Sequence, residues 1–262
     1  VPQPGKRNDP LINTIIHGPS GRTVDFPSLA EAIASYDVIY LSEKHDNPDH
    51  HAIQHKIIEA LLLNKEKAGP SPSIGFEFFS THHTSDLLGF IDRGPEKQSE
   101  KIEIMIEKNL RMKLGWHLQS DTLWQYYFDL LLLAREKGLT AAGLDLSAAL
   151  KKRITRKGAA GLNALEKDQI FSTGLTDPVY KNYMFDIFKA VHCGMGNEKM
   201  QARLYDTWVA RNDAMAQSIV RMHTHSGGPV IVIIGYGHTE YGLGVINRVA
   251  AIDSTIRQVN IG

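Results

Sequence analysis

Short apolar runs, each followed by a polar turn and a longer amphipathic segment, recur along most of the chain. This alternation is how βα units of a parallel sheet appear in a sequence, because parallel strands are buried on both faces and helices cover them. The runs are residues 38–42, 73–78, 140–144 and 229–234. Between them, residues 50–65 and 123–137 repeat apolar side chains at helical spacing. The pattern predicts an α/β fold with a mainly parallel sheet flanked by helices.

Two shorter patterns lie near the ends of the chain. Residues 12–17 and 22–26 alternate around a Gly-Pro-Ser-Gly turn, which predicts a small hairpin. Ser28 and Glu31 then have capping-box spacing, so we expect a helix to start at Ser28. Residues 255–261 predict a closing edge strand.

The βα rhythm breaks after residue 157, where helical segments follow one another without an intervening strand. Asp177 and Pro178 have the cap and fixed-φ residue that open one of these helices. The break predicts a small all-helical insertion. The expected organisation is an N-terminal tether at 1–10, an α/β domain at 11–157 and 198–262, and a helical subdomain at 158–197.

Composition excludes several classes of protein. With 29 Lys and Arg against 29 Asp and Glu, the chain has no excess positive field for nucleic acid. Cys193 is the single cysteine, which excludes an intramolecular disulfide. No run approaches the roughly 20 apolar residues of a membrane helix. The start of the chain, without Met, is compatible with an upstream signal or lipid-attachment segment that has been removed.

Ionisable side chains stand at the ends of three predicted strands. Glu43 and His45 follow the first strand, Glu77 lies among aromatic residues at the end of the second, and His238 follows the last buried run after two glycines. Because the carboxyl ends of parallel strands meet at one edge of a sheet, we expect these four side chains to converge there.

Two carboxylates and two imidazoles suit two kinds of chemistry. They could form a general acid/base set, or they could bind a divalent metal ion. Spacing alone does not choose between these, so Glu43, His45, Glu77 and His238 are candidates for both roles. The chain has no Gly-x-Ser-x-Gly elbow, which argues against a serine hydrolase of the α/β-hydrolase type.

Several blocks together resemble the ChaN-like haem-binding uptake proteins of the Tiki and erythromycin-esterase superfamily. The blocks are LSEKHDN at 41–47, GFEFF at 75–79, AVHCGM at 190–195, GYGH at 235–238 with GLG at 242–244, and a weaker one at 206–216. They span most of the chain in the family's order. The family usually has Gly where this chain has Ser42, whose side chain could narrow the approach to Glu43 and His45.

The resemblance implies a parallel sheet with a small helical domain and a role in bacterial iron acquisition. Family members look like periplasm-facing lipoproteins that hold haem in a dimer, with Tyr on the iron and His and Lys near the propionates. For this chain it implies haem as cofactor, a homodimer, an outer-membrane haem receptor as a further partner, and lipid anchoring on the periplasmic side. The candidate haem contacts are Lys44, His45, His192, Tyr183, Tyr205, Tyr236 and His238.

Two functions therefore compete at this stage. The first, which we favour, is a non-enzymatic haem-binding protein of bacterial haem uptake, with its pocket near the C-terminal edge of the sheet. The alternative is a hydrolase of the erythromycin-esterase or Tiki type, using a metal ion or the Glu and His side chains alone.

Overall fold

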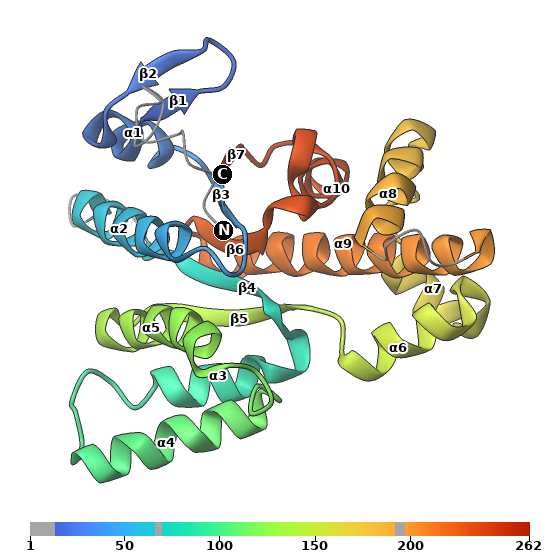
Figure 1. Ribbon diagram of the computed structural model, residues 1–262. Coiled ribbons are helices and arrows are strands. Elements are labelled where there is room, and N and C mark those ends of the chain that lie inside the picture. Colours follow the sequence, from blue (N-terminus) through green and yellow to red (C-terminus); the bar gives the residue numbers. More distant parts are fainter. Residues whose placement is uncertain (1–13, 66–69, 192–196) are drawn as a thin grey trace, which may run out of the picture.

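A five-stranded sheet forms the centre of the computed structural model, which describes residues 14–65, 70–191 and 197–262. Its strands lie in the order β5-β4-β6-β3-β7, and every neighbouring pair is parallel (Figure 1). Their bounds are β3 Val38–Glu43, β4 Ser73–Ser80, β5 Thr140–Asp145, β6 Val230–Gly235 and β7 Gln258–Ile261. The predicted α/β fold with a parallel sheet flanked by helices is confirmed.

Side chains alternate between the two faces of the sheet, and each face has its own core. Ile39 and Ile231 face a large cluster that includes side chains of α2, α3, α4 and α5. Val38 and Val232 face a second cluster built with α9 and α10. Figure 1 shows α2 and α5 on one side of the sheet and α9 and α10 on the other. The continuous apolar runs in the sequence follow from this burial on both faces.

Ten helices lie within the described ranges. They are α1 Phe26–Ile33, α2 Pro48–Lys65, α3 Thr84–Ile91, α4 Glu100–Lys113, α5 Asp121–Lys137, α6 Ala148–Lys157, α7 Ala164–Ile170, α8 Pro178–Val191, α9 Glu198–Ser226 and α10 Val245–Ile252. None of these helices has both the length and the apolar character needed to cross a bilayer.

The N-terminal hairpin forms as predicted, with β1 Ile15–His17 antiparallel to β2 Arg22–Val24. The helix that follows begins earlier than expected. Asp25, rather than Ser28, caps α1, because its carboxylate accepts the Ser28 N–H at 2.8 Å. A proline also occupies the first turn, where its missing N–H costs nothing. The predicted cap at Ser28 was therefore wrong.

Helices follow one another between β5 and β6 in the described part of the chain. α6, α7 and α8 all pack against α9, whose 29 residues also run along one face of the sheet (Figure 1). Asp177 caps α8, accepting the N–H groups of Val179 and Tyr180. The boundaries of a separate helical subdomain at 158–197 stay a prediction, and the expected tether at 1–10 lies outside the described residues.

Candidate functional site

Glu43 is the last residue of β3, and its carboxylate is completely buried. Tyr127 on α5 donates its hydroxyl proton to Oε1, and Gln54 Nε2 on α2 donates to Oε2 at 2.7 Å. His45 Nδ1 lies 3.1 Å from Oε1, and His51 Nδ1 lies 3.4 Å from Oε2. Hydrogen bonds from two helices and the following turn therefore stabilise a charge that burial alone would disfavour.

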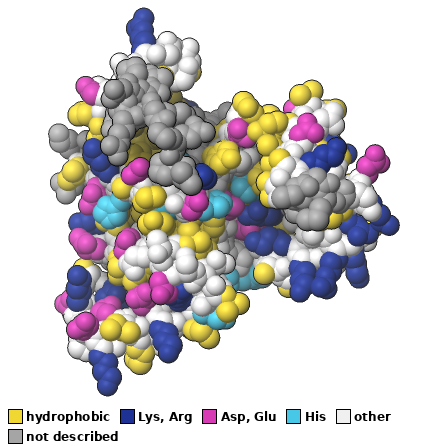
Figure 2. Space-filling model, in the orientation of Figure 1, with side chains coloured by type: hydrophobic (Ala, Val, Ile, Leu, Met, Phe, Trp, Pro, Cys, Tyr) yellow, Lys and Arg dark blue, Asp and Glu magenta, His cyan; other side chains and the backbone are white. Residues whose placement is uncertain are grey.

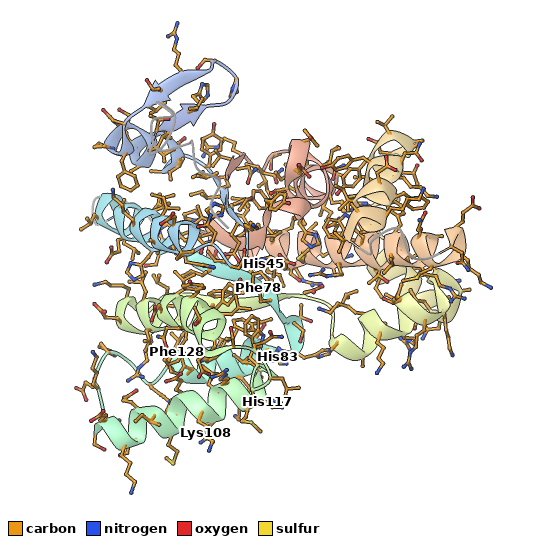
Figure 3. The ribbon with its side chains drawn as sticks, in the orientation of Figure 1. His45, Phe78, His83, Lys108, His117 and Phe128 are labelled. Carbon is orange, nitrogen blue, oxygen red and sulfur yellow. The ribbon has the colours of Figure 1, made fainter. Side chains whose placement is uncertain are left out.

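His45 is the accessible member of this cluster, with half of its side chain exposed. The hydrogen bond to Glu43 raises the pKa of the imidazole, and the nearby charge of Glu77 acts in the same direction against partial burial. Its ring contacts Phe78 edge-on, with centroids 4.8 Å apart (Figure 3). The ring also lies close against Gly235. Only glycine leaves room for it there, because a Cβ would lie 2.6 Å from His45 Cε1.

Glu77 forms the centre of a second buried cluster at the end of β4. Its Oε1 accepts from Arg211 Nη2 at 2.6 Å and lies 3.1 Å from His238 Nε2, and its Oε2 accepts from the Gly235 N–H at 2.6 Å. Burial alone would raise the pKa of Glu77. The hydrogen bond from His238, the Arg211 guanidinium and the Gly235 N–H together hold that pKa well below its usual value.

His238 is buried directly after β6, and its position is fixed on three sides. Burial lowers the pKa of its imidazole, although the charge of Glu77 opposes this shift. Its Nδ1 lies 2.5 Å from the Asn212 side chain, and its ring stacks on Trp208 with centroids 3.9 Å apart. Both ring nitrogens face oxygen acceptors, Asn212 Oδ1 at Nδ1 and Glu77 Oε1 at Nε2, so His238 orients Glu77 from inside the protein.

Sequence reasoning missed the basic and acidic residues that extend this second cluster. Arg211 on α9 bridges Glu77 and Asp145, donating through Nε to Asp145 Oδ2 at 2.9 Å. Lys151 Nζ lies 2.6 Å from the same oxygen. One signal for Asp145 was present, since it is the last residue of β5 and the strand-end argument applies to it as well. Arg211 lies within the weaker resemblance block at 206–216, but hydrophobic periodicity did not distinguish it from the surface arginines.

The two clusters meet at Gly235, because β6 lies between β3 and β4 in the sheet. Gly235 pairs with Glu43 in the strand register, and its N–H reaches Glu77. The structure thus brings Glu43, His45, Glu77 and His238 together at one sheet edge. Across the described residues, no group of three or more His, Cys, Asp or Glu is arranged to hold a metal ion. Binding of a divalent metal stays a prediction.

The remaining candidate residues lie in different surroundings. Lys44 is largely exposed, and its ammonium is 3.9 Å from Asp46. Tyr236, directly after Gly235, is 55% exposed. Tyr183 on α8 donates to Glu240 Oε2 at 2.6 Å. Lys44 directly follows Glu43, and Tyr236 directly follows Gly235. These two exposed residues are therefore the candidates nearest to the sheet-edge cluster along the chain.

Three further predictions fall elsewhere. Tyr205 lines a cavity of about 530 Å³ between α9 and the start of α8, together with Phe171 and Asp213. His192 lies outside the described residues. Ser42 turns away from Glu43, and its hydroxyl lies 2.6 Å from Thr239 Oγ1. This hydroxyl therefore does not narrow the approach to His45.

The sheet-edge site is accessible to solvent at His45, half of whose side chain is exposed. The second described cavity, of about 280 Å³, is lined by His51, Tyr126 and other residues of α2 and α5. Neither cavity is lined by Glu43, His45, Glu77 or His238. Figure 2 shows histidine side chains exposed near the middle of the face that it presents. A ligand at His45 would therefore lie partly open to solvent.

Comparisons with known proteins place this architecture in a family. A family model described as haem-binding uptake, Tiki superfamily, ChaN matches residues 29–249. A solved structure described as cofacial haem binding to ChaN of Campylobacter jejuni aligns with a TM-score of 0.73 and 19% identity, over 94% of this chain and 89% of that one. At this identity the likeness shows a shared fold.

A mutant of the erythromycin esterase EreC, in its open conformation, aligns more distantly. Its TM-score is 0.47 at 12% identity, over 90% of this chain and 73% of that one, which is too distant to carry an argument about function. No curated protein sequence matches the chain. Since the family model covers most of the chain and includes both buried carboxylates and His238, this protein belongs to the haem-binding uptake family of the Tiki superfamily that includes ChaN.

Proposed function

We propose that this protein binds haem at the C-terminal edge of its sheet and acts in bacterial haem uptake. The observation that carries the proposal is the family match over residues 29–249. The shared fold with ChaN of Campylobacter jejuni, a protein whose structure is described as binding haem cofacially, supports it.

The residues at the sheet edge fit such a ligand. His45 presents an imidazole whose Nε2 has no hydrogen-bond partner among the described residues, while Nδ1 is held by Glu43. A ligating imidazole oriented through its second nitrogen is the usual arrangement at metal centres. Tyr236 is also exposed, and the phenolic oxygen of tyrosine is a known ligand of haem iron. We propose His45 and Tyr236 as the residues that would hold the iron.

The two haem propionates need cationic partners near the same edge. Lys44 precedes His45, and two thirds of its side chain is exposed. Its ion pair with Asp46 is long at 3.9 Å and exposed, so the ammonium can exchange partners. We propose that Lys44 pairs with a propionate. Phe78, edge-on to His45, would offer an apolar contact to the ring system.

A haem bound at this open edge would leave one face to solvent, which is unfavourable for a large apolar ring. We propose that a second copy of the chain covers it and that haem binding drives homodimer formation. Light scattering with and without haemin tests this. Haemin-saturated protein that stays monomeric at micromolar concentration contradicts the dimer without contradicting haem binding.

Titration of haemin into the purified chain, followed by the Soret band, tests the ligand and its place. We expect a saturable shift that His45→Ala or Tyr236→Phe weakens by at least tenfold. Tyr205→Phe is the matched control, since Tyr205 lines the separate cavity beyond α9. A wild-type protein without a saturable Soret shift, or equal losses in all three variants, would refute the proposal.

One observation favours a second candidate, a hydrolase. Glu43 holds His45 through Nδ1 at 3.1 Å, which is how a carboxylate orients a histidine general base. We expect such an enzyme to lose turnover on an ester panel in both Glu43→Gln and His45→Ala. Turnover retained in both variants, or absent in the wild type, excludes this candidate.

The cellular setting is also a proposal. We propose that the mature protein is lipid-anchored on the periplasmic side of the membrane and receives haem that an outer-membrane receptor imports. Fractionation of cells that express the complete gene tests the location. Recovery of the protein in the cytoplasmic fraction would contradict it.

A further inference from the structure

The outward ridge of α4 differs from an ordinary surface helix. Ile106 and Leu110 pack inward, and the residues opposite them at helical spacing form the outer ridge. We define this α4 ridge as Lys101, Ile104, Met105, Lys108 and Met112. Its three apolar side chains are 59%, 56% and 53% exposed, in sequence order. Figure 3 shows Lys108 on the outer side of α4.

Two of the three acidic side chains of this helix, Glu103 and Glu107, are held on the flank that faces α5, while Glu100 is exposed in the first turn. Glu103 binds Arg135 with Nη1 at 2.8 Å from Oε2, and Glu107 accepts from Trp124 Nε1 at 2.8 Å. These contacts fix the flank that faces α5. Within residues 14–65, 70–191 and 197–262, neither Lys101 nor Lys108 forms an ion pair. The ridge therefore carries two lysines and three exposed apolar groups, and the exposed Glu100 borders it one turn before Ile104.

The loop after α4 extends the apolar surface. Arg111 donates through Nε to the Trp116 carbonyl at 3.2 Å and through Nη2 to the Gln119 carbonyl at 2.5 Å. These bonds hold the loop against the end of the helix. Leu118, within that loop, is 85% exposed. The loop that directly follows α4 thus adds a fourth exposed large apolar side chain.

The charge of the ridge indicates its partner. A second copy would oppose two lysines with two lysines across a symmetric contact, and like charges there are unfavourable. An anionic bilayer surface is complementary: lysine ammonium groups reach lipid phosphates while Ile, Leu and Met side chains enter the boundary of the acyl region. We propose that the α4 ridge, with Leu118, docks this protein onto anionic lipid headgroups.

This docking surface is separate from the proposed haem site. α4 lies outside α3 and α5, at the far side from α9 and α10 (Figure 1). Docking through it would therefore leave the sheet edge open to haem. The docking proposal does not depend on haem binding.

Vesicle co-sedimentation of the whole chain tests the ridge, with phosphatidylglycerol-containing vesicles compared with pure phosphatidylcholine. We expect binding to the anionic vesicles only, reduced by added salt. The pair Lys101→Gln and Lys108→Gln should lower the partition coefficient about thirtyfold, because each lysine near an anionic surface contributes about a factor of five. Lys152→Gln with Lys157→Gln, exposed on α6, is the charge-matched control and should bind as the wild type does.

A second pair of variants separates the apolar contribution from the charge. Met105→Ser with Met112→Ser should weaken vesicle binding several-fold, whereas Leu165→Ser with Val179→Ser, also highly exposed, should not. Circular dichroism confirms that each variant is folded. No vesicle binding by the wild type, equal losses in ridge and control variants, or binding to polyglutamate but not to vesicles would each overturn the proposal.

Discussion

Arg211 offers the sharpest test of how the site is held together. Its guanidinium lies between two buried carboxylates, 2.6 Å from Glu77 Oε1 and 2.9 Å from Asp145 Oδ2. Its own side chain is only 21% exposed. Arg211→Met keeps much of the apolar stem but removes the charge, so both carboxylates lose their shared partner.

The expected loss follows from what remains at each carboxylate. Removing one partner of a buried pair costs about 3–5 kcal/mol, because the other charge stays buried without compensation. Here Lys151 still binds Asp145, and the Gly235 N–H still binds Glu77. We therefore expect the free energy of unfolding at neutral pH to fall by about 3 kcal/mol, at the lower end of that range.

The loss should depend on pH. The pKa of Glu77 is depressed in the folded protein, so its charge adds stability that is fully present above the unfolded value of 4.5 and is lost as the pH falls through the folded pKa. Without Arg211 this pKa rises toward its usual value. The difference in stability between wild type and Arg211→Met should therefore be full at neutral pH and shrink below 4.5.

Urea unfolding followed by circular dichroism, at neutral pH and at pH values below the usual Glu pKa, measures both effects. Arg257→Met is the control, because that arginine pairs with Asp37 at the surface and is 62% exposed. It should have a much smaller effect, with little change in that effect across the same pH range. A loss of under about 1 kcal/mol for Arg211→Met, or a loss that does not shrink in acid, would refute the reasoning.

Three further predictions follow from close contacts. Gly235→Ala should displace the His45 ring, so that its NMR titration midpoint falls toward 6.5, and an unchanged midpoint would contradict the contact. Gly143→Ala should lower the free energy of unfolding by about 2–3 kcal/mol, because its Cβ overlaps backbone carbonyls at the end of β4, and urea titration measures this. Tyr127→Phe should cost about 1–3 kcal/mol in the same assay, because Glu43 loses a buried donor, and a neutral effect would show that water replaces the hydroxyl.

The sheet was predictable because continuous apolar runs in the sequence indicate strands that are buried on both faces. The run at 229–234 is apolar at every position and the run at 38–42 at every position but Ser42, and the strands β3 and β6 are buried on both faces. The cap of α1 was not predictable with the same certainty. Asp25 and Ser28 both have side chains that can cap a helix, and only the backbone angles decide which one does.

The site was predictable in its acids and imidazoles but not in its cation. Glu43, Glu77 and His238 lie where buried strands end. Strand ends can be recognised in the sequence, and in parallel sheets they are where ligands bind. Arg211 lies within a long amphipathic helix, where an inward-facing arginine looks like many outward-facing ones. Its role depends on which turn of α9 passes the end of β4, and this is a property of packing between distant segments.

The sequence by itself therefore determined the α/β class, the parallel sheet and the residues that gather at its edge, because burial and strand ends leave local patterns. Tertiary structure alone decided how those residues pair. β6 lies between β3 and β4, so Gly235 separates a Glu43 cluster that leaves His45 exposed from a Glu77 cluster that buries His238. The edge strand β7 was recognisable because it is partly polar, but the order of the inner strands β4, β6 and β3 leaves no trace in hydrophobic periodicity, since all three are buried on both faces.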